Sequence, residues 1–239
     1  MDLKNKKAIV TGGAIRVGRA ITLALAEAGC DVFMHYGRSE AAALETRREA
    51  EAHGVSVRIH SADLSDPEAI PPLMEAAGSA DILVNSAALY LDGDLASTDL
   101  KNWEIQFGVN LRAPFLLSQA FAAQIPDSGS GKIINILDAR MFKPGDDHFA
   151  YRLTKSALAA MTENLAHDLA PRITVNGVAL GAILPPPDKD QSYLDNLAQT
   201  RIPLKKAGNP KAVTDNVLHL LRHDFLTGVI IRTDGGEFL

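Results

Sequence analysis

The chain is poor in cysteine, in surplus charge and in long apolar runs, and each shortage excludes a class of protein. Among its 239 residues Cys30 is the only cysteine, which excludes an internal disulfide and a cysteine-based metal site. A formal net charge of −5, without a basic face or arm, excludes nucleic-acid binding as the main role. No apolar run is long enough to span a bilayer, and the polar start lacks a signal-peptide core. We therefore expect a cytoplasmic protein without a membrane partner.

Strand-like and helix-like runs alternate along the chain, and no linker divides it. Strands are expected at Lys7–Thr11, Asp31–Tyr36, Val55–His60, Asp81–Asn85, Lys132–Leu137, Ile173–Val178 and Gly228–Arg232. Helices are expected at Val17–Ala28, Ser39–His53, Pro67–Ala77, Leu111–Gln124, Ala150–Leu169 and Lys211–His223. This alternation predicts an α/β fold over residues 1–239: a single-domain, Rossmann-like, doubly wound fold with a seven-stranded parallel sheet.

A glycine-rich segment, TGGAIRVG at residues 11–18, lies between the first expected strand and the first expected helix. Dinucleotide phosphates bind at this place in doubly wound folds, because glycines allow close approach and the helix start presents its amides to an anion. Glycine turns after strands are common, so the segment alone is a weak signal. Arg16 stands at the middle position, where a glycine is usual.

The ends of the next strands carry residues that suit the rest of a dinucleotide. After the second strand, HYGRS (His35–Ser39) offers cationic and hydroxyl groups where NAD-binding proteins place an acid, and this favours NADP. The alternative is that Arg38 is a solvated loop charge. Asp63 follows the third strand, where it can meet an adenine, and the small residues after Asn85 leave room for a ribose and nicotinamide.

A tyrosine and a lysine follow the fifth strand at helical spacing. In YRLTK, Tyr151 and Lys155 are four residues apart and share one face of the expected helix. Because an ammonium stabilises a phenolate, we expect Lys155 to lower the pKa of Tyr151 and make it a usable proton donor. Such a pair alone is most often a chance surface pair, but here it follows a nucleotide-type glycine loop.

Taken together, these segments resemble the short-chain dehydrogenase/reductase family over essentially the whole chain. The resemblance lies in TGGAIRVG, NSAA, VNLRAPF with Asn110, YRLTK, ITVNGVALG and LTGVIIRTDGG. It implies a nicotinamide-dependent oxidoreductase in which Lys155 also binds the nicotinamide ribose and Asn110 holds a proton-relay water. It also implies a homotetramer.

Two departures from the usual family pattern narrow the resemblance. Asp138 holds the place of the serine that polarises a substrate carbonyl, and a carboxylate there would repel a developing oxyanion. Arg16, combined with Asp138, Tyr151 and Lys155, is similar to the pteridine reductase branch, with its dihydromonapterin and alternative dihydrofolate reductases. That branch implies Arg16 beside the cofactor pyrophosphate and the pterin edge. It also implies stacking of Tyr90 on the pterin.

The resemblance gives three sets of candidate residues. The catalytic candidates are Asp138, Tyr151, Lys155 and Asn110, and the substrate candidates are Arg16, Tyr90, Asp138 and Tyr151. The cofactor candidates for NADPH are Gly12, Arg16, Val17, His35, Tyr36, Arg38, Ser39, Asp63, Leu64, Asn85, Ser86, Ala87, Tyr151, Lys155, Gly181 and Ile183. No metal site is expected, because the histidines lack ligand spacing.

Three functions stay open at this point. The leading expectation is an NADPH-dependent reductase of a pterin-like small molecule, with residues 181–205 as a lid. Ala88 replaces a serine common in the pteridine branch, and Leu180 replaces the usual proline, which leaves room for a carbonyl or enoyl reductase instead. The third alternative is a catalytically silent NADP-binding regulatory protein, against which the retention of Asn110, Tyr151 and Lys155 argues.

Overall fold

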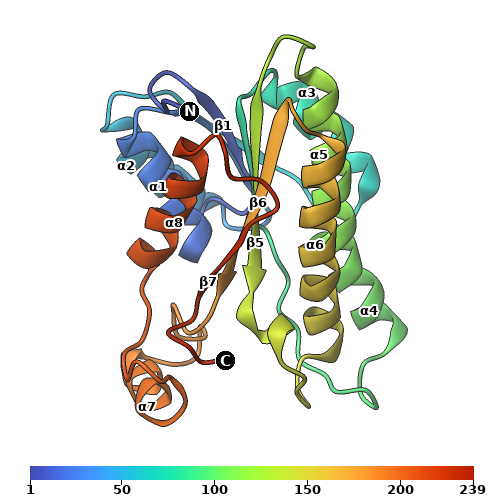
Figure 1. The fold of residues 1–239 in the computed structure, drawn as a ribbon, viewed down its shortest axis with the longest axis vertical. Helices are drawn as coiled ribbons and strands as arrows, with labels where there is room; N and C mark the ends of the chain where they lie inside the picture. Colours follow the sequence, from blue (N-terminus) through green and yellow to red (C-terminus); the bar gives the residue numbers. More distant parts are fainter.

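The computed structural model describes residues 1–239 and contains one seven-stranded parallel sheet (Figure 1). The strands are β1 (Lys7–Val10), β2 (Asp31–Tyr36), β3 (Val57–Ser61), β4 (Ile82–Asn85), β5 (Gly131–Asp138), β6 (Ile173–Leu180) and β7 (Ile230–Thr233). Their order is β3-β2-β1-β4-β5-β6-β7, so the chain runs outward from β1 in both directions. This confirms the predicted single-domain, doubly wound fold.

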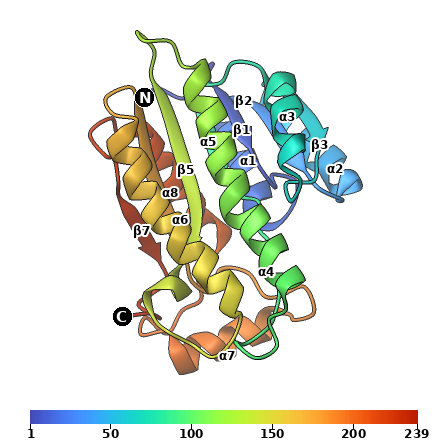
Figure 2. The same cartoon turned by 90° about the vertical axis from the view of Figure 1, so that its right-hand side faces the viewer.

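Helices cover both faces of the sheet, and α7 lies beyond its end (Figures 1 and 2). The helices of the chain are α1 (Arg16–Glu27), α2 (Glu40–Glu51), α3 (Ile70–Ala77), α4 (Leu100–Phe107), α5 (Ala113–Gln124), α6 (Phe149–Asp168), α7 (Gln191–Arg201) and α8 (Pro210–Arg222). On one face, Ile21 and Leu25 of α1 share a buried cluster with Val217 of α8. On the other, Leu73 of α3 and Leu117 of α5 lie in a second cluster. The sheet is thus buried on both sides, as parallel sheets require.

Two helices, α4 and α7, were not among the predicted elements. α4 buries Gln106 alone and α7 buries only Leu194 and Ala198, so neither carries the apolar stripe that reveals a helix in a sequence. Their starts are instead fixed by side-chain caps: Asp99 accepts from the Asn102 amide at 2.7 Å and Asp190 from the Ser192 amide at 3.0 Å. The predicted lid, residues 181–205, contains α7.

The predicted helix Leu111–Gln124 begins two residues later, at Ala113, and a wider π-helical turn over Gly108–Arg112 joins it to α4. Such turns insert one extra residue into a helix and re-aim the side chains around it. Asn110, one of the catalytic candidates, lies in this turn.

The register of the sheet places the ends of its strands at one edge. Asp138 pairs with Leu180 of β6, and Asn135 of β5 pairs with Asn85 of β4. Figure 2 shows α7 beyond this carboxyl edge, which is where doubly wound folds bind their ligands. None of the helices combines the length and apolar character that a bilayer crossing requires. No cluster of His, Cys, Asp or Glu is arranged to hold a metal ion.

The glycine loop approaches the start of α1 so closely that one added methyl group at Gly18 should destabilise the fold. A Cβ on Gly18 would overlap the carbonyl oxygen of Gly12 and approach the Cα of Gly13 to 3.2 Å. We expect Gly18→Ala to lower the free energy of unfolding by about 2 kcal/mol, since both neighbours are backbone and cannot move aside. Urea denaturation of the parent and the variant measures this difference.

Gly37→Ala is the matched control, because a Cβ at Gly37 would meet no atom within 4 Å. Equal midpoints for Gly18→Ala and Gly37→Ala would contradict the tight contact between the glycine loop and α1.

Candidate active site

Asp138 and Tyr151 are joined by a hydrogen bond across the end of the sheet. Asp138 is the last residue of β5, and Tyr151 lies in the first turn of α6 with 7% of its surface exposed. The Tyr151 hydroxyl donates to Asp138 Oδ2 at 2.9 Å, and the Arg140 amide donates to Asp138 Oδ1 at 2.8 Å. Both carboxylate oxygens are therefore held, and the tyrosine hydroxyl points at one of them.

Lys155 lies one turn after Tyr151 on α6, as the spacing predicts, but its ammonium has another partner. Its Nζ donates to the carbonyl oxygen of Ile136 at 2.8 Å and lies 5.7 Å from the centre of the Tyr151 ring. Lys155 is 3% exposed. Burial lowers the pKa of Lys155 to about 8, against the opposing effect of the Asp138 carboxylate.

The expected lowering of the tyrosine pKa by Lys155 is wrong for this structure. Burial, followed by the charge of Asp138 and the hydrogen bond to it, raises the pKa of Tyr151 well above its ordinary value. The cause is geometric: the anion is hydrogen-bonded to the phenol, whereas the ammonium is bonded to a carbonyl. Tyr151 therefore keeps its proton at neutral pH and presents it to Asp138.

Asn110 is fully buried and holds the segment after β4 against α6. Its Oδ1 accepts from the Leu89 amide at 2.7 Å, and its Nδ2 donates to the Leu89 carbonyl at 2.8 Å and to Thr154 Oγ1 at 3.2 Å. These bonds fix the backbone next to Tyr90. The relay-water role that the resemblance implies for Asn110 stays a prediction.

Tyr90 packs against the ring of Tyr151 and has one of its own faces covered by His148. The His148 ring stacks on it at 3.9 Å between centres, and Tyr151 meets it edge-on at 4.7 Å. Arg140 lies with its Cζ 5.8 Å from the Tyr90 centre. Burial raises the pKa of the Tyr90 phenol to about 12. Because the His148 ring covers one face of the Tyr90 ring, a flat substrate could stack only on the opposite face.

Two residues of this region, His148 and Arg140, were absent from the predicted site. His148 precedes α6, and its Nδ1 donates to the Leu91 carbonyl at 3.0 Å. Arg140 pairs with Asp147 at 2.7 Å and so holds the loop between β5 and α6. The position of His148 three residues before Tyr151 was the one sequence signal for this contact.

The glycine loop holds Arg16 in a backbone conformation that favours glycine. Arg16 has a φ of +54°, and Ile15 before it provides no side-chain cap for the first amides of α1. The Arg16 Nη2 donates to the Pro185 carbonyl at 2.9 Å. The side chain thus connects the loop to the segment 181–205, a contact the sequence did not predict.

The predicted phosphate-binding residues at the end of β2 differ in their exposure to solvent. Arg38 is exposed, Ser39 is partly exposed and Tyr36 is buried in the core. His35, by contrast, is 3% exposed and has both ring nitrogens engaged, with the Gly12 amide and the Ala62 carbonyl. Both ring nitrogens of His35 thus have partners within the chain, and the expected contact of His35 with a 2′-phosphate stays a prediction.

The adenine-side and ribose-side candidates are held by local bonds. Asp63 Oδ1 accepts from the Ser65 amide at 2.9 Å and its hydroxyl at 2.7 Å, and these bonds lower the pKa of Asp63. The Ser86 and Ala87 amides donate to Thr11 Oγ1 at 3.0 and 3.1 Å. These bonds fix the backbone after β4 on the glycine loop.

The remaining cofactor candidates are mostly buried or closely packed, and their contacts with a cofactor stay predictions. Asn85 is buried and donates to Asn135 Oδ1 at 2.9 Å, so its side chain faces the core. Leu64 and Ile183 are buried, at 5% and 4% exposure. Gly181 lies so close to Asp234 that a Cβ would come within 2.6 Å of its Cα. Val17 is partly buried at the start of α1, beside Arg16.

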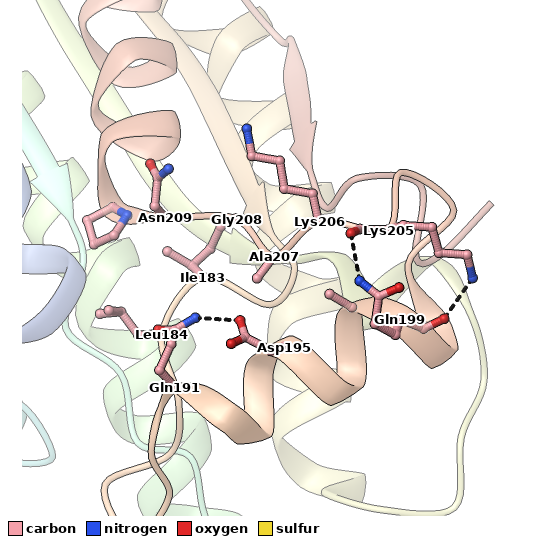
Figure 3. A pocket seen from close by; sticks show the side chains of 12 residues that line it. Ile183, Leu184, Gln191, Asp195, Gln199, Lys205, Lys206, Ala207, Gly208 and Asn209 are labelled. Carbon is pink, nitrogen blue, oxygen red and sulfur yellow. Dashed lines mark hydrogen bonds between the residues drawn. The ribbon is translucent and has the colours of Figure 1, made fainter.

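A separate cavity of about 440 Å³ lies between α7 and residues 205–210 (Figure 3). Gln199 of α7 donates to the Lys205 carbonyl at 3.2 Å, and Lys205 Nζ returns a bond to the Gln199 carbonyl at 2.8 Å. These bonds connect the end of α7 to the chain that follows it. Neither Asp138 nor Tyr151 lines this cavity, so it is distinct from the catalytic candidates.

Comparison with known proteins places the chain in a family. The model of the short chain dehydrogenase family matches residues 6–193, so the chain belongs to this family of oxidoreductases. Oxidoreductase YohF of Escherichia coli is 33% identical over 97% of this chain and 95% of its own. The 3-oxoacyl-[acyl-carrier-protein] reductase FabG of Staphylococcus epidermidis is 32% identical over 98% of this chain and 100% of its own.

Solved structures similar to this chain include an alternative dihydrofolate reductase and a fluorescent protein. FolM alternative dihydrofolate reductase 1 from Brucella canis, complexed with NADP, matches with a TM-score of 0.91 and 30% identity, over 100% of this chain and 96% of that one. A blue fluorescent protein from a metagenomic library, in complex with NADPH, matches with a TM-score of 0.91 and 33% identity over the whole of both chains.

The buried lysine makes the stability of the protein depend on pH. The pKa of Lys155 is depressed from 10.5 to about 8 on folding, so in this interval the unfolded chain binds more protons than the folded one. Lys155 should therefore contribute a rise of about 2 kcal/mol in the free energy of unfolding between about pH 8 and pH 10. The raised pKa values of Cys30 and Tyr151 act in the opposite direction over this interval, so the difference between the parent and a variant without Lys155 isolates the contribution of the lysine. Urea denaturation at both pH values measures it.

Lys155→Met removes the titrating group at similar length and should lack this rise. If the parent and Lys155→Met change equally with pH, Lys155 is not the group responsible and its depressed pKa is refuted.

Proposed function

We propose that the protein is an NADPH-dependent reductase of pterins or dihydropterins, with proton delivery by Asp138, Tyr151 and Lys155. The observation that carries this proposal is the hydrogen bond from the Tyr151 hydroxyl to Asp138 Oδ2. A reductase of ketones needs a neutral donor where the oxyanion forms, and a carboxylate at that place is repulsive. A carboxylate suits a substrate that takes up a proton on a ring nitrogen.

The donors around the glycine loop fit a dinucleotide phosphate. The first amides of α1 have no capping side chain, and its first turn contains no acid. A negatively charged group is stabilised at such a helix start. Arg38 and Ser39, at the end of β2, supply a cation and a hydroxyl for a 2′-phosphate, and the NADP in the FolM structure supports this choice. NADPH would supply the hydride.

Proton delivery follows from the bonds within the chain. Tyr151 stays protonated because its pKa is raised, and its hydroxyl is held at Asp138 Oδ2. To deliver this proton, the hydroxyl would turn from Asp138 to the ring nitrogen of the substrate, and a phenolate would remain on Tyr151. The backbone amide of Arg140 holds Asp138 from the other side. Lys155, anchored on the Ile136 carbonyl, adds the positive charge that offsets the carboxylate and would bind the nicotinamide ribose.

The substrate would lie against the face of Tyr90 that the His148 ring does not cover, with Arg16 on its polar side. Stacking of a flat heterocycle on one tyrosine face is a favourable aromatic contact. The structural likeness to FolM alternative dihydrofolate reductase 1 supports the pterin class. We also propose that residues 181–205 act as the lid, and that the protein is a cytoplasmic homotetramer.

Reduction of a 3-oxoacyl thioester is the second candidate function. The FabG relatives, at 31% and 32% identity over nearly the whole chain, favour it. Asp138 argues against it, because its carboxylate would face the oxygen of the reduced carbonyl.

Substrate selection gives a direct test of the two candidates. We expect a dihydropterin to support NADPH oxidation, a planar antifolate to compete with it, and an acetoacetyl thioester to be a poor substrate. Asp138→Ser and Asp138→Asn, the second of similar size without charge, should impair the pterin reaction more than NADPH binding. Absorbance at the NADPH band gives rates, and fluorescence titration gives affinity. Efficient acetoacetyl reduction without pterin turnover would leave only the family assignment.

The tyrosine hydroxyl provides a separate test of the chemistry. We expect Tyr151→Phe to cut turnover of the pterin by about a hundredfold, the scale of losing a general acid, while NADPH binding is nearly unchanged. Lys155→Ala should weaken both, because the lysine serves the ribose as well as the charge balance. Normal turnover by Tyr151→Phe would show that another group delivers the proton.

A further inference from the structure

His35 joins the glycine loop to the turn after β3 through its imidazole. The Gly12 amide donates to His35 Nδ1 at 3.2 Å, and His35 Nε2 contacts the Ala62 carbonyl at 3.0 Å. The carbonyl of His35 also accepts from the Gly13 amide at 3.0 Å. One residue of β2 thus holds two consecutive amides of the loop and, on its other side, the residue before Asp63.

These two ring contacts determine the protonation state of the imidazole. A carbonyl only accepts, so Nε2 carries the hydrogen that it gives to Ala62. An amide N–H only donates, so Nδ1 must be the bare nitrogen that receives the bond from Gly12. A protonated imidazole has no acceptor and would place a second hydrogen against the Gly12 amide.

We infer that His35 is a positioning residue of the cofactor site, whose neutral imidazole sets the spacing between the phosphate-binding loop and the adenine-binding turn. The inference rests on the proposed use of NADPH, whose pyrophosphate and adenine would occupy these two places. Gly12 has a φ of +63° and packs closely on the segment after β4, since a Cβ there would come within 2.9 Å of the Ala87 Cα. The bonds from the Gly12 and Gly13 amides to His35 tie this part of the loop to β2.

The surroundings of His35 favour the neutral form that this role requires. Burial lowers the pKa of His35 from its ordinary 6.5, and nearby His60 lowers it further. The Ala62 carbonyl and the Asp63 carboxylate act in the opposite direction. His60 is its register partner on β3, Asp63 follows that strand, and the glycine loop presents a backbone amide. NADPH affinity should thus hold at neutral pH and fall in acid.

Two substitutions separate the two contacts of the imidazole. Glutamine can place a polar atom near Nε2 and keep the Ala62 contact, but it leaves the Gly12 amide unpaired. We expect His35→Gln to bind NADPH about tenfold more weakly, the scale of one unsatisfied buried donor. Its affinity for adenosine 2′-phosphate, which has no pyrophosphate, should stay within twofold of the parent. Isothermal titration measures both ligands on the full chain.

Asparagine can keep an acceptor near Nδ1 that does not titrate, and this isolates the pH effect. From pH 8 to pH 5, the NADPH affinity of the parent should fall more steeply than that of His35→Asn, although the cofactor phosphate titrates equally in both. His167→Asn, at the exposed end of α6 and away from His35, is the matched control and should keep the profile of the parent.

The possible results distinguish this inference from the proposed function. NADPH binding by His35→Gln within twofold of the parent, or an equal loss of both ligands, would overturn the positioning role. If His35→Gln fails to fold, the pH comparison decides, and identical profiles for the parent and His35→Asn would overturn it. Absence of NADPH binding by the parent would refute the cofactor assignment itself. Failure of the pterin as substrate leaves these binding results unaffected.

Discussion

The carboxylate of Asp138 is the point from which the geometry of the active site is built. One of its oxygens accepts from the Arg140 amide and so starts the short helical turn Ala139–Phe142 after β5. The other accepts from Tyr151 on α6. Arg140 then pairs with Asp147, whose second bond goes to Arg152 on α6. Charge-assisted bonds thus connect the loop between β5 and α6 to α6 itself, and the Tyr151 hydroxyl is bonded to the residue at which this loop begins.

The same loop borders Tyr90, the proposed stacking residue for the substrate. His148 stands at its end with a left-handed backbone, φ +48°, and this conformation precedes the helix that contains Tyr151. Its ring covers Tyr90, while Asn110 fixes the adjoining backbone at Leu89. These contacts join the residue before α6, the segment after β4 and the turn before α5, so the position of the Tyr90 ring depends on all three.

The sequence predicts the elements and the edge where the site lies, because both depend on patterns that are local in the chain. Apolar runs alternate with helical stretches in the sequence. Parallel strands bring their carboxyl ends to one edge of the sheet, and this does not depend on which side chains bond to one another there. The hydrogen-bond partners of the side chains, by contrast, depend on residues that are distant in the sequence. Lys155 lies one turn from Tyr151 as predicted, yet its ammonium binds Ile136 and leaves the phenol to Asp138. His35 belongs to a predicted phosphate-binding run, but burial turns its ring inward to Gly12.

The overall fold cannot select between the two candidate reactions, because members of one family share it. The FolM structure and the FabG relatives have nearly equal identity to this chain, 30% and 32%, over almost its whole length. Function must be argued from the site. There, a serine hydroxyl and a carboxylate act oppositely on a carbonyl oxygen that gains charge, since one can donate and the other only repels. Two hydrogen bonds hold the Asp138 carboxylate, so turning it away from a substrate oxygen would break them. A substrate whose acceptor is a ring nitrogen avoids this repulsion, because protonation leaves no oxyanion beside the carboxylate.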